Sequence, residues 1–199
     1  MSKPSLQASW VCDAEADAAV DRQQWEQACV LHQALLVKEP GNCLAMYHLG
    51  YILGRMGDRM QEARQYERAV QCGMDKDDRL FFNLGMAYGE MNLMDKALAS
   101  FERAVTINPD NAENFFGLGL TAQAAGQRQR AQTALANAVK IDPNHWEARI
   151  MLTRIYLDGG RLAAARNHLE LLRRSVPDNE EVIELWQTYE DRSVTTFEP

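Results

Sequence analysis

The sequence predicts an all-α fold, a solenoid of about five helix-turn-helix repeats followed by a C-terminal capping helix. Two observations predict this fold: leucine and glycine recur with a period of about 34 residues, and turn-forming residues interrupt each period at two points. The recurring leucines, with spacings of 35, 34 and 34 residues, are Leu49, Leu84, Leu118 and Leu152. A glycine directly follows the first three of them. Units this short cannot bury their apolar faces alone, so neighbouring repeats are expected to stack into one core.

Proline marks the boundaries between the periods. The boundary prolines, 34 residues apart in the stretches NPDN, DPNH and VPDN, are Pro109, Pro143 and Pro177. A second break near the middle of each period falls at Gly57, Asn92, Gly126 and Gly160. Glycine and asparagine tolerate the left-handed backbone conformation that often ends a helix. Each period is therefore predicted to contain two helices.

The predicted elements follow in order along a single domain, residues 1–199. The first repeat, 9–42, is degenerate, and the clearer repeats are 43–77, 78–111, 112–145 and 146–179. A capping helix is expected at 180–192, where the apolar residues are Val182, Ile183, Trp186 and Tyr189. Residues 193–199 are expected to form a frayed tail.

Glycine at one repeated position also bears on packing. Glycine inside a helix costs about 1 kcal/mol relative to alanine, so its recurrence needs a structural reason. The three glycines are Gly50, Gly85 and Gly119. They predict that the backbone of a neighbouring helix comes too close for a side chain.

Composition narrows the class of protein. The 199 residues are 46% hydrophobic and 25% charged, as in an ordinary globular protein. The net charge is −7 and the 21 lysines and arginines are scattered, which disfavours a nucleic-acid partner. The N-terminus lacks a continuous apolar segment and no later stretch approaches 18 uncharged apolar residues, so no membrane span and a cytoplasmic location are expected.

No cofactor, metal or catalytic group is expected. The cysteines form no C-x-x-C motif and none pairs with a histidine at ligand spacing; they are Cys12, Cys29, Cys43 and Cys72. They are predicted to be small buried residues in a reducing compartment, without a disulfide. The four histidines are dispersed and no acid, base or nucleophile cluster is evident, so the protein is not expected to be an enzyme.

The residues of 78–111 resemble the tetratricopeptide repeat, whose pattern is W-x2-L-G-x2-Y, then A-x3-F, an alanine and a closing proline. The matching residues are Phe81, Leu84, Gly85, Tyr88, Ala97, Phe101, Ala104 and Pro109. Residues 112–145 match through Phe115, Leu118, Gly119, Ala122, Ala131, Leu135, Ala138 and Pro143. The resemblance implies a right-handed α-α superhelix.

The adjacent Phe81 and Phe82 reveal a second apolar stripe. Neighbouring residues of a helix point about 100° apart, so both rings cannot sit in the middle of one buried face. Phe81 shares a face with Leu84 and Tyr88 and is expected in the core. The stripe of Phe82 lies two residues before and two after the recurring leucine, at Tyr47, Tyr51, Phe82, Met86, Phe116, Leu120, Ile150 and Arg154.

The resemblance implies that this stripe lines a concave groove that receives an extended peptide or a helix of a partner. Arg154 is expected at the end of the groove, available to a carboxylate of the partner. Asn83 lies beside the stripe. Some similar modules clamp a C-terminal carboxylate with a set of Lys, Asn and Arg side chains, and Asn83 is the one residue here that matches this set. That clamp is therefore not expected.

The sequence therefore favours a non-catalytic adaptor or chaperone that binds a protein or peptide in an apolar, aromatic-lined groove. One alternative is a self-assembling homo-oligomeric scaffold. Another is a helper subunit of an enzyme complex. A bacterial secretion-type chaperone is a more specific version of the first reading.

Overall fold

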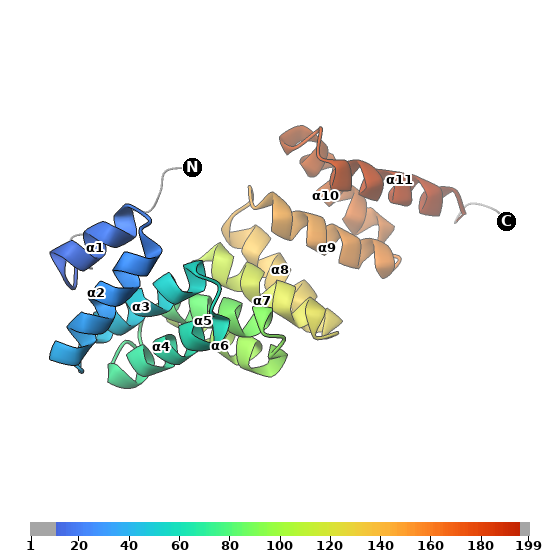
Figure 1. Ribbon diagram of the computed structural model, residues 1–199. Coiled ribbons are helices and arrows are strands. Elements are labelled where there is room, and N and C mark those ends of the chain that lie inside the picture. Colours follow the sequence, from blue (N-terminus) through green and yellow to red (C-terminus); the bar gives the residue numbers. More distant parts are fainter. Residues whose placement is uncertain (1–10, 196–199) are drawn as a thin grey trace. The chain divides into compact units, whose positions relative to one another are not determined.

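The computed structural model describes residues 11–195, which form eleven α-helices and no strand (Figure 1). In the first half of the chain the helices are α1 (Ala14–Asp21), α2 (Trp25–Lys38), α3 (Cys43–Arg55), α4 (Arg59–Cys72), α5 (Asp78–Glu90) and α6 (Met94–Ile107). In the second half they are α7 (Ala112–Ala124), α8 (Arg128–Ile141), α9 (Trp146–Asp158), α10 (Leu162–Ser175) and α11 (Glu180–Thr195). None of the helices in residues 11–195 combines the length and the apolar character needed to cross a bilayer.

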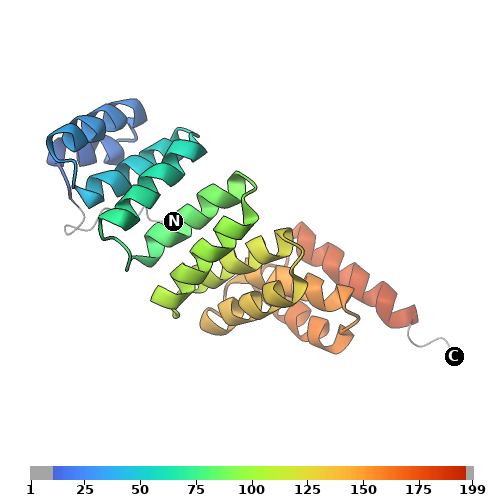
Figure 2. The same cartoon turned by 90° about the horizontal axis from the view of Figure 1, so that it is seen from below.

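The chain divides into two compact units, Met1–Ile107 and Asn108–Pro199, and each is described by itself. In the first unit the successive pairs α1–α2, α3–α4 and α5–α6 pack as hairpins. In the second unit α7–α8 and α9–α10 are the hairpins, and α11 packs on α9 and α10 (Figures 1 and 2). The fold is thus the all-α helical-repeat solenoid that the sequence predicts.

The turns inside the hairpins contain a left-handed residue, as the sequence predicts. The backbone φ angle is 86° at Gly57, 59° at Asn92, 73° at Gly126 and 68° at Gly160. The structure adds a fifth case, because Gln23, between α1 and α2, has φ of 59°. The first repeat therefore makes the same turn without the glycine or asparagine that would have marked it in the sequence.

The recurring glycines mainly face side chains, which corrects the expectation of a neighbouring backbone at Gly50 and Gly85; at Gly119 the backbone nitrogen of Leu135 would also lie 3.3 Å from an added Cβ. A Cβ atom placed on Gly50 would lie 2.7 Å from the Tyr66 ring, and one on Gly119 would lie 2.7 Å from Cγ of Leu135. In these three hairpins the second helix thus inserts a large residue over the glycine of the first. The missing side chain makes room for that residue.

Each unit has its own apolar core. The first unit buries Tyr66, Leu80 and Leu84 between α3, α4 and α5. The second buries Leu169 of α10 against Val182 and Leu185 of α11.

The last helix differs from expectation in two ways. Ile183 is 57% exposed, and Leu185, which was not expected to pack, is buried beside the expected Val182. Residues 193–195, expected in a frayed tail, continue the helix; the rest of that tail, 196–199, lies outside the described residues.

The cysteines depart from the sequence-based expectation. Cys43 and Cys72 form a disulfide, with a Cα–Cα distance of 5.4 Å. It joins the first residue of α3 to the last residue of α4, closing the open end of that hairpin. Cys12 and Cys29 are free thiols, and of these Cys29 is buried, as expected. The prediction of four reduced, buried cysteines was therefore wrong for the Cys43–Cys72 pair.

Candidate protein-binding face

In the first unit, the stripe residues of α3 and α5 lie on adjoining helices. The side-chain amide of Asn83 on α5 donates a hydrogen bond to the hydroxyl of Tyr47 on α3, at 3.2 Å. Burial raises the pKa of Tyr47 to about 12, so its hydroxyl keeps its proton. We call the surface formed by Tyr47, Tyr51, Phe82, Asn83 and Met86 the α3–α5 face.

The two stripe positions differ in exposure. At the earlier position the rings are partly buried: Phe82 packs edge-on against Phe101 with ring centroids 5.5 Å apart. Tyr47 similarly lies 5.6 Å from the ring of Tyr66. At the later position, Tyr51 and Met86 are each 39% exposed. The face therefore has an aromatic base anchored in the core and an exposed outer row.

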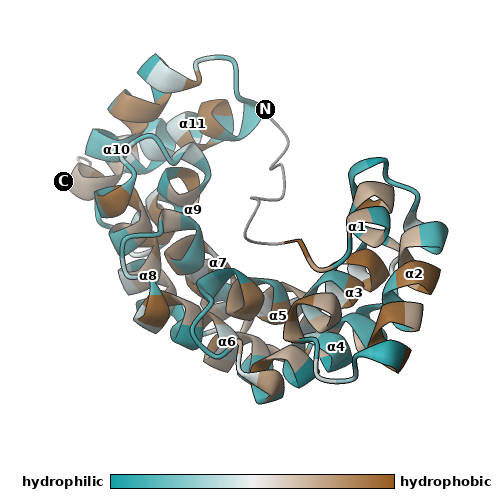
Figure 3. Ribbon diagram, turned by 90° about the vertical axis from the view of Figure 1, so that its left-hand side faces the viewer, coloured by the Kyte–Doolittle hydropathy of each residue, from teal (hydrophilic) through white to brown (hydrophobic). Residues whose placement is uncertain are grey.

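Trp25 extends this face and was missed from the sequence. The ring of Trp25, at the start of α2, packs edge-on to Tyr51 with centroids 6.1 Å apart. The guanidinium of Arg55 lies 5.3 Å from the centre of the same indole. The first repeat is degenerate, so its residues could not be aligned with those of the later repeats. The sequence therefore did not predict that Trp25 lies beside Tyr51. Figure 3 shows hydrophobic and hydrophilic residues side by side on α2 and α3.

In the second unit the stripe is shorter than predicted. Leu120 on α7 is 43% exposed, and the partly buried ring of Phe116 lies 4.7 Å from that of His145, the N-cap residue of α9. Ile150 does not belong to an exposed surface, because it is 2% exposed within the core of α9, α10 and α11. Arg154 is exposed but forms an ion pair with Glu181 of α11 rather than standing free for a partner.

A different hollow lies in the first unit between α4, α5 and α6. Cations cover its aromatic walls: the guanidinium of Arg103 lies 5.4 Å from the centre of the Phe81 ring, and the ammonium of Lys96 lies 5.0 Å from that of Tyr88. Both rings of this hollow therefore already have a cationic partner within the chain.

Comparison with known proteins identifies the family. Models of the tetratricopeptide repeat match residues 79–111 and 122–185. The chain is a tetratricopeptide repeat protein. The repeats make it a protein-interaction or scaffold module.

Curated relatives match this tetratricopeptide repeat protein over a segment only. The mouse protein O-mannosyl-transferase TMTC1 is 32% identical over 114 residues, which is 55% of this chain and 12% of that protein. Cellulose synthase 2 operon protein C of Komagataeibacter xylinus is 29% identical over 133 residues, 58% of this chain and 10% of that protein. DnaJ homolog subfamily C member 3 of the rat is 29% identical over 118 residues, 59% of this chain and 23% of that protein. The chain thus spans less than a quarter of the length of each of these relatives.

Solved structures share the fold along most of the chain. YrrB, described as a TPR protein with an unusual peptide-binding site, superposes with a TM-score of 0.77 at 21% identity, covering 86% of this chain and 88% of YrrB. MamA superposes with a TM-score of 0.73 at 16% identity, covering 94% of this chain and 98% of MamA. At these identities the likeness concerns the fold alone.

Proposed function

We propose that this tetratricopeptide repeat protein is a non-catalytic adaptor or chaperone that binds an apolar peptide or helix of a partner protein on its α3–α5 face. The observation that carries the proposal is the exposure of Tyr51 and Met86, 39% each, at the same position of two successive repeats. Large apolar side chains gathered on one exposed face favour a binding role, because a soluble protein gains nothing by leaving them in water.

The chemistry of the face suits an apolar segment with a few polar groups. Trp25, Tyr51, Phe82 and Met86 offer aromatic and thioether surface, and such side chains dominate binding energy at protein interfaces. Asn83 can contribute an amide beside them. The peptide-binding site in the description of YrrB supports a peptide as the ligand for the same fold. The mannosyl-transferase activity in the name of TMTC1 is not carried over, since the chain matches 12% of that protein.

Selection from a random peptide library displayed on phage, followed by calorimetry with the selected peptides, tests the proposal. We expect the selected peptides to be rich in large apolar residues. The changes Phe82→Glu and Met86→Glu should each weaken binding at least tenfold, or about 1.4 kcal/mol, because the new carboxylate must lose water without gaining a counter-ion.

The matched control is Met60→Glu. Met60 is 59% exposed on α4, outside the α3–α5 face, so this change adds the same charge at another exposed methionine. Equal affinity for wild type, Phe82→Glu and Met86→Glu would contradict the proposal.

The alternative function is a homo-oligomeric scaffold in which the α3–α5 face receives a second copy of the chain. Light scattering over a range of concentrations separates the two. The mass of a scaffold should increase with protein concentration and should be smaller for the Met86→Glu variant. An adaptor should have the same mass at every concentration, in the wild type and in the variant.

A further inference from the structure

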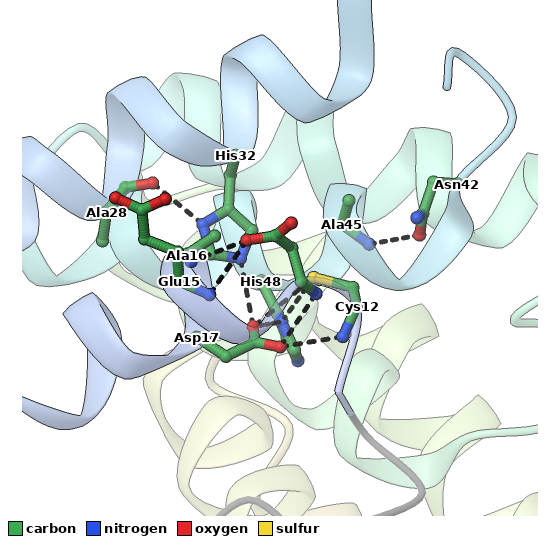
Figure 4. Close-up of polar contacts among 10 residues, drawn as sticks. Cys12, Glu15, Ala16, Asp17, Ala28, His32, Asn42, Ala45 and His48 are labelled. Atoms are coloured by element: carbon green, nitrogen blue, oxygen red, sulfur yellow. Dashed lines mark hydrogen bonds and ion pairs between the residues drawn. The ribbon is translucent and has the colours of Figure 1, made fainter. Parts of the chain in front are cut away.

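Four side chains that are candidate metal ligands converge near the N-terminal end of the described chain. Cys12 precedes α1, Asp17 lies in α1, His32 in α2 and His48 in α3. One donor atom from each lies within 4.8 Å of the donor atoms of the other three. Figure 4 shows the four side chains pointing toward one another. We call them the Cys12 cluster.

Four of the six separations between the donor atoms are close to those of a tetrahedral site. Asp17 Oδ1 lies 2.9 Å from Nδ1 of His48 and 3.3 Å from Nε2 of His32. Sγ of Cys12 lies 3.3 Å from Nδ1 of His48 and 3.4 Å from Asp17 Oδ1. Tetrahedral zinc, with bonds of about 2.0 Å to nitrogen and oxygen and about 2.3 Å to sulfur, separates neighbouring donors by roughly 3.3–3.6 Å. An ion would therefore need only small adjustments of these side chains.

His32 is oriented as a metal ligand is. Its Nδ1 lies 2.8 Å from the carbonyl oxygen of Ala28, and because a carbonyl only accepts, that nitrogen carries the hydrogen. In the neutral ring, Nε2 then presents its lone pair to the cluster. The residue is fully buried, and Nε2 has no hydrogen-bond partner among the described residues. A lone pair facing the Asp17 carboxylate in a buried site requires a cation between them, or a proton on the ring.

Asp17 is held in a corresponding way. Its Oδ2 accepts hydrogen bonds from the backbone N–H groups of Cys12, at 2.8 Å, and Asp13, at 3.1 Å. The other oxygen, Oδ1, is thereby directed at the two histidines and the thiol. Supporting hydrogen bonds of this kind orient the ligands in natural metal sites.

We propose that the Cys12 cluster binds one Zn²⁺ ion in a closed, structural site. The mixture of one sulfur, two imidazole nitrogens and one carboxylate oxygen suits zinc, whereas magnesium and calcium prefer oxygen donors alone. The thiolate and the carboxylate balance the charge of the ion, which leaves a buried site without net charge. Four protein ligands leave no open position for a substrate.

The ion would compensate for the degenerate first repeat. α1 has eight residues, and in the core cluster between α1, α2 and α3 the buried residues of α1 and α2 are Ala19, Ala28 and Cys29, while the larger Leu31 and Leu36 are only partly buried. Zinc would connect the segment before α1 to α1, α2 and α3, replacing contacts that larger side chains make in the later repeats. The free energy of metal binding then adds to that of folding.

The test uses the full chain, stripped of metal with a chelator and titrated with ZnCl₂ or CoCl₂. We expect one equivalent of either ion to bind, and zinc to raise the Tm. Cobalt should show the intense visible absorption of tetrahedral coordination and a thiolate-to-metal charge-transfer band in the near ultraviolet. Cys12→Ser should abolish the charge-transfer band and weaken zinc binding at least tenfold, and His32→Gln should also weaken binding at least tenfold.

Two matched variants serve as controls. Cys29→Ser removes the other free cysteine of the described chain, and His145→Gln removes a buried histidine of the second unit. Both should bind zinc as the wild type does, and circular dichroism of the metal-free proteins should confirm that all variants fold. Absence of stoichiometric binding by the wild type would overturn the proposal and favour a protonated His32 paired with Asp17. Zinc binding that Cys12→Ser leaves unchanged would equally overturn it.

Discussion

Gly85 of α5 lies against the ring of Phe101 of α6 so closely that a Cβ atom on Gly85 would come within 2.8 Å of Cε2 and 2.9 Å of Cζ. Phe101 is 1% exposed, so its ring has no free space into which to move. The pair sets the distance between the two helices of this hairpin. Gly50 with Tyr66, and Gly119 with Leu135, repeat the arrangement in two other hairpins.

We predict that Gly85→Leu lowers the free energy of unfolding by about 3 kcal/mol or more, because overpacking a filled core forces the helices apart. Urea denaturation followed by circular dichroism measures the change. The control is Gly89→Ala on the same helix, where an added Cβ meets nothing within 4 Å. That change should be neutral or should stabilise the protein by up to about 1 kcal/mol, since alanine is the better helix former. Similar losses in the two variants would show that Gly85 has no special packing role.

The change Gln23→Gly should relieve backbone strain in the turn between α1 and α2 and so stabilise the protein. Gln23 has φ of 59°, a conformation that costs a residue with a Cβ roughly 1–2 kcal/mol. Glycine avoids that steric cost, so we expect the free energy of unfolding to rise by about 1 kcal/mol after its greater backbone entropy is taken into account. The reverse change, Gly126→Ala at φ of 73°, should lower stability in the same urea assay. A destabilising Gln23→Gly would mean that the glutamine side chain makes a contribution larger than this strain.

The Cys43–Cys72 disulfide should stabilise the α3–α4 hairpin. The two residues are 29 positions apart, and a cross-link closing a loop of this size typically contributes about 2–4 kcal/mol by restricting the unfolded chain. The double variant Cys43→Ser/Cys72→Ser should lose about that amount in non-reducing urea denaturation. Wild type with a reductant should fall to the same value, while Cys29→Ser should respond to reductant as the wild type does. Finding four free thiols in the oxidised, denatured protein would contradict the bond.

His168 should make stability depend on pH. Burial, together with the Arg149 guanidinium 3.3 Å away, lowers the pKa of His168 to about 4. An unfolded histidine has a pKa of about 6.5. Below that pH the histidine therefore binds a proton in the unfolded chain but not in the folded chain. The stabilising contribution of neutral His168 is therefore complete above about pH 6.5 and is lost as the pH falls toward 4.

The measurement compares wild type with His168→Gln at pH 7 and pH 5. Wild type should lose more free energy of unfolding between these values than the variant does. Equal losses would show that His168 titrates normally in the folded protein.

Much of the fold was determined by the sequence alone, because it depends on local periodicity. The helix period of about 3.6 residues assigned Phe81 to the core, where it is 7% exposed, and Phe82 to a neighbouring stripe, where it is partly buried. The residues in the middle of the repeats, Gly57, Asn92, Gly126 and Gly160, predicted left-handed turns because few other residues adopt that conformation without strain. Helical stripes and turn chemistry act within one or two turns of the chain, so one sequence contains them.

The tertiary structure decided which residues meet over long range. Ile150 shares the stripe spacing with Phe82, yet it is buried in a core that includes Val182 and Leu185 of α11. The repeat pattern could not show that burial, because it depends on how a helix outside the repeats packs. The ion-pair partner of Arg154, Glu181, also lies on α11.

The cysteines and histidines show the same limit. The Cys43–Cys72 bond joins the two ends of one hairpin, and the Cys12 cluster draws single residues from the segment before α1 and from three helices. Ligand spacing along the chain reveals a metal site only when one loop or helix supplies several donors. Here the packing of α1, α2 and α3 brings the donors together, so the convergence exists only in three dimensions.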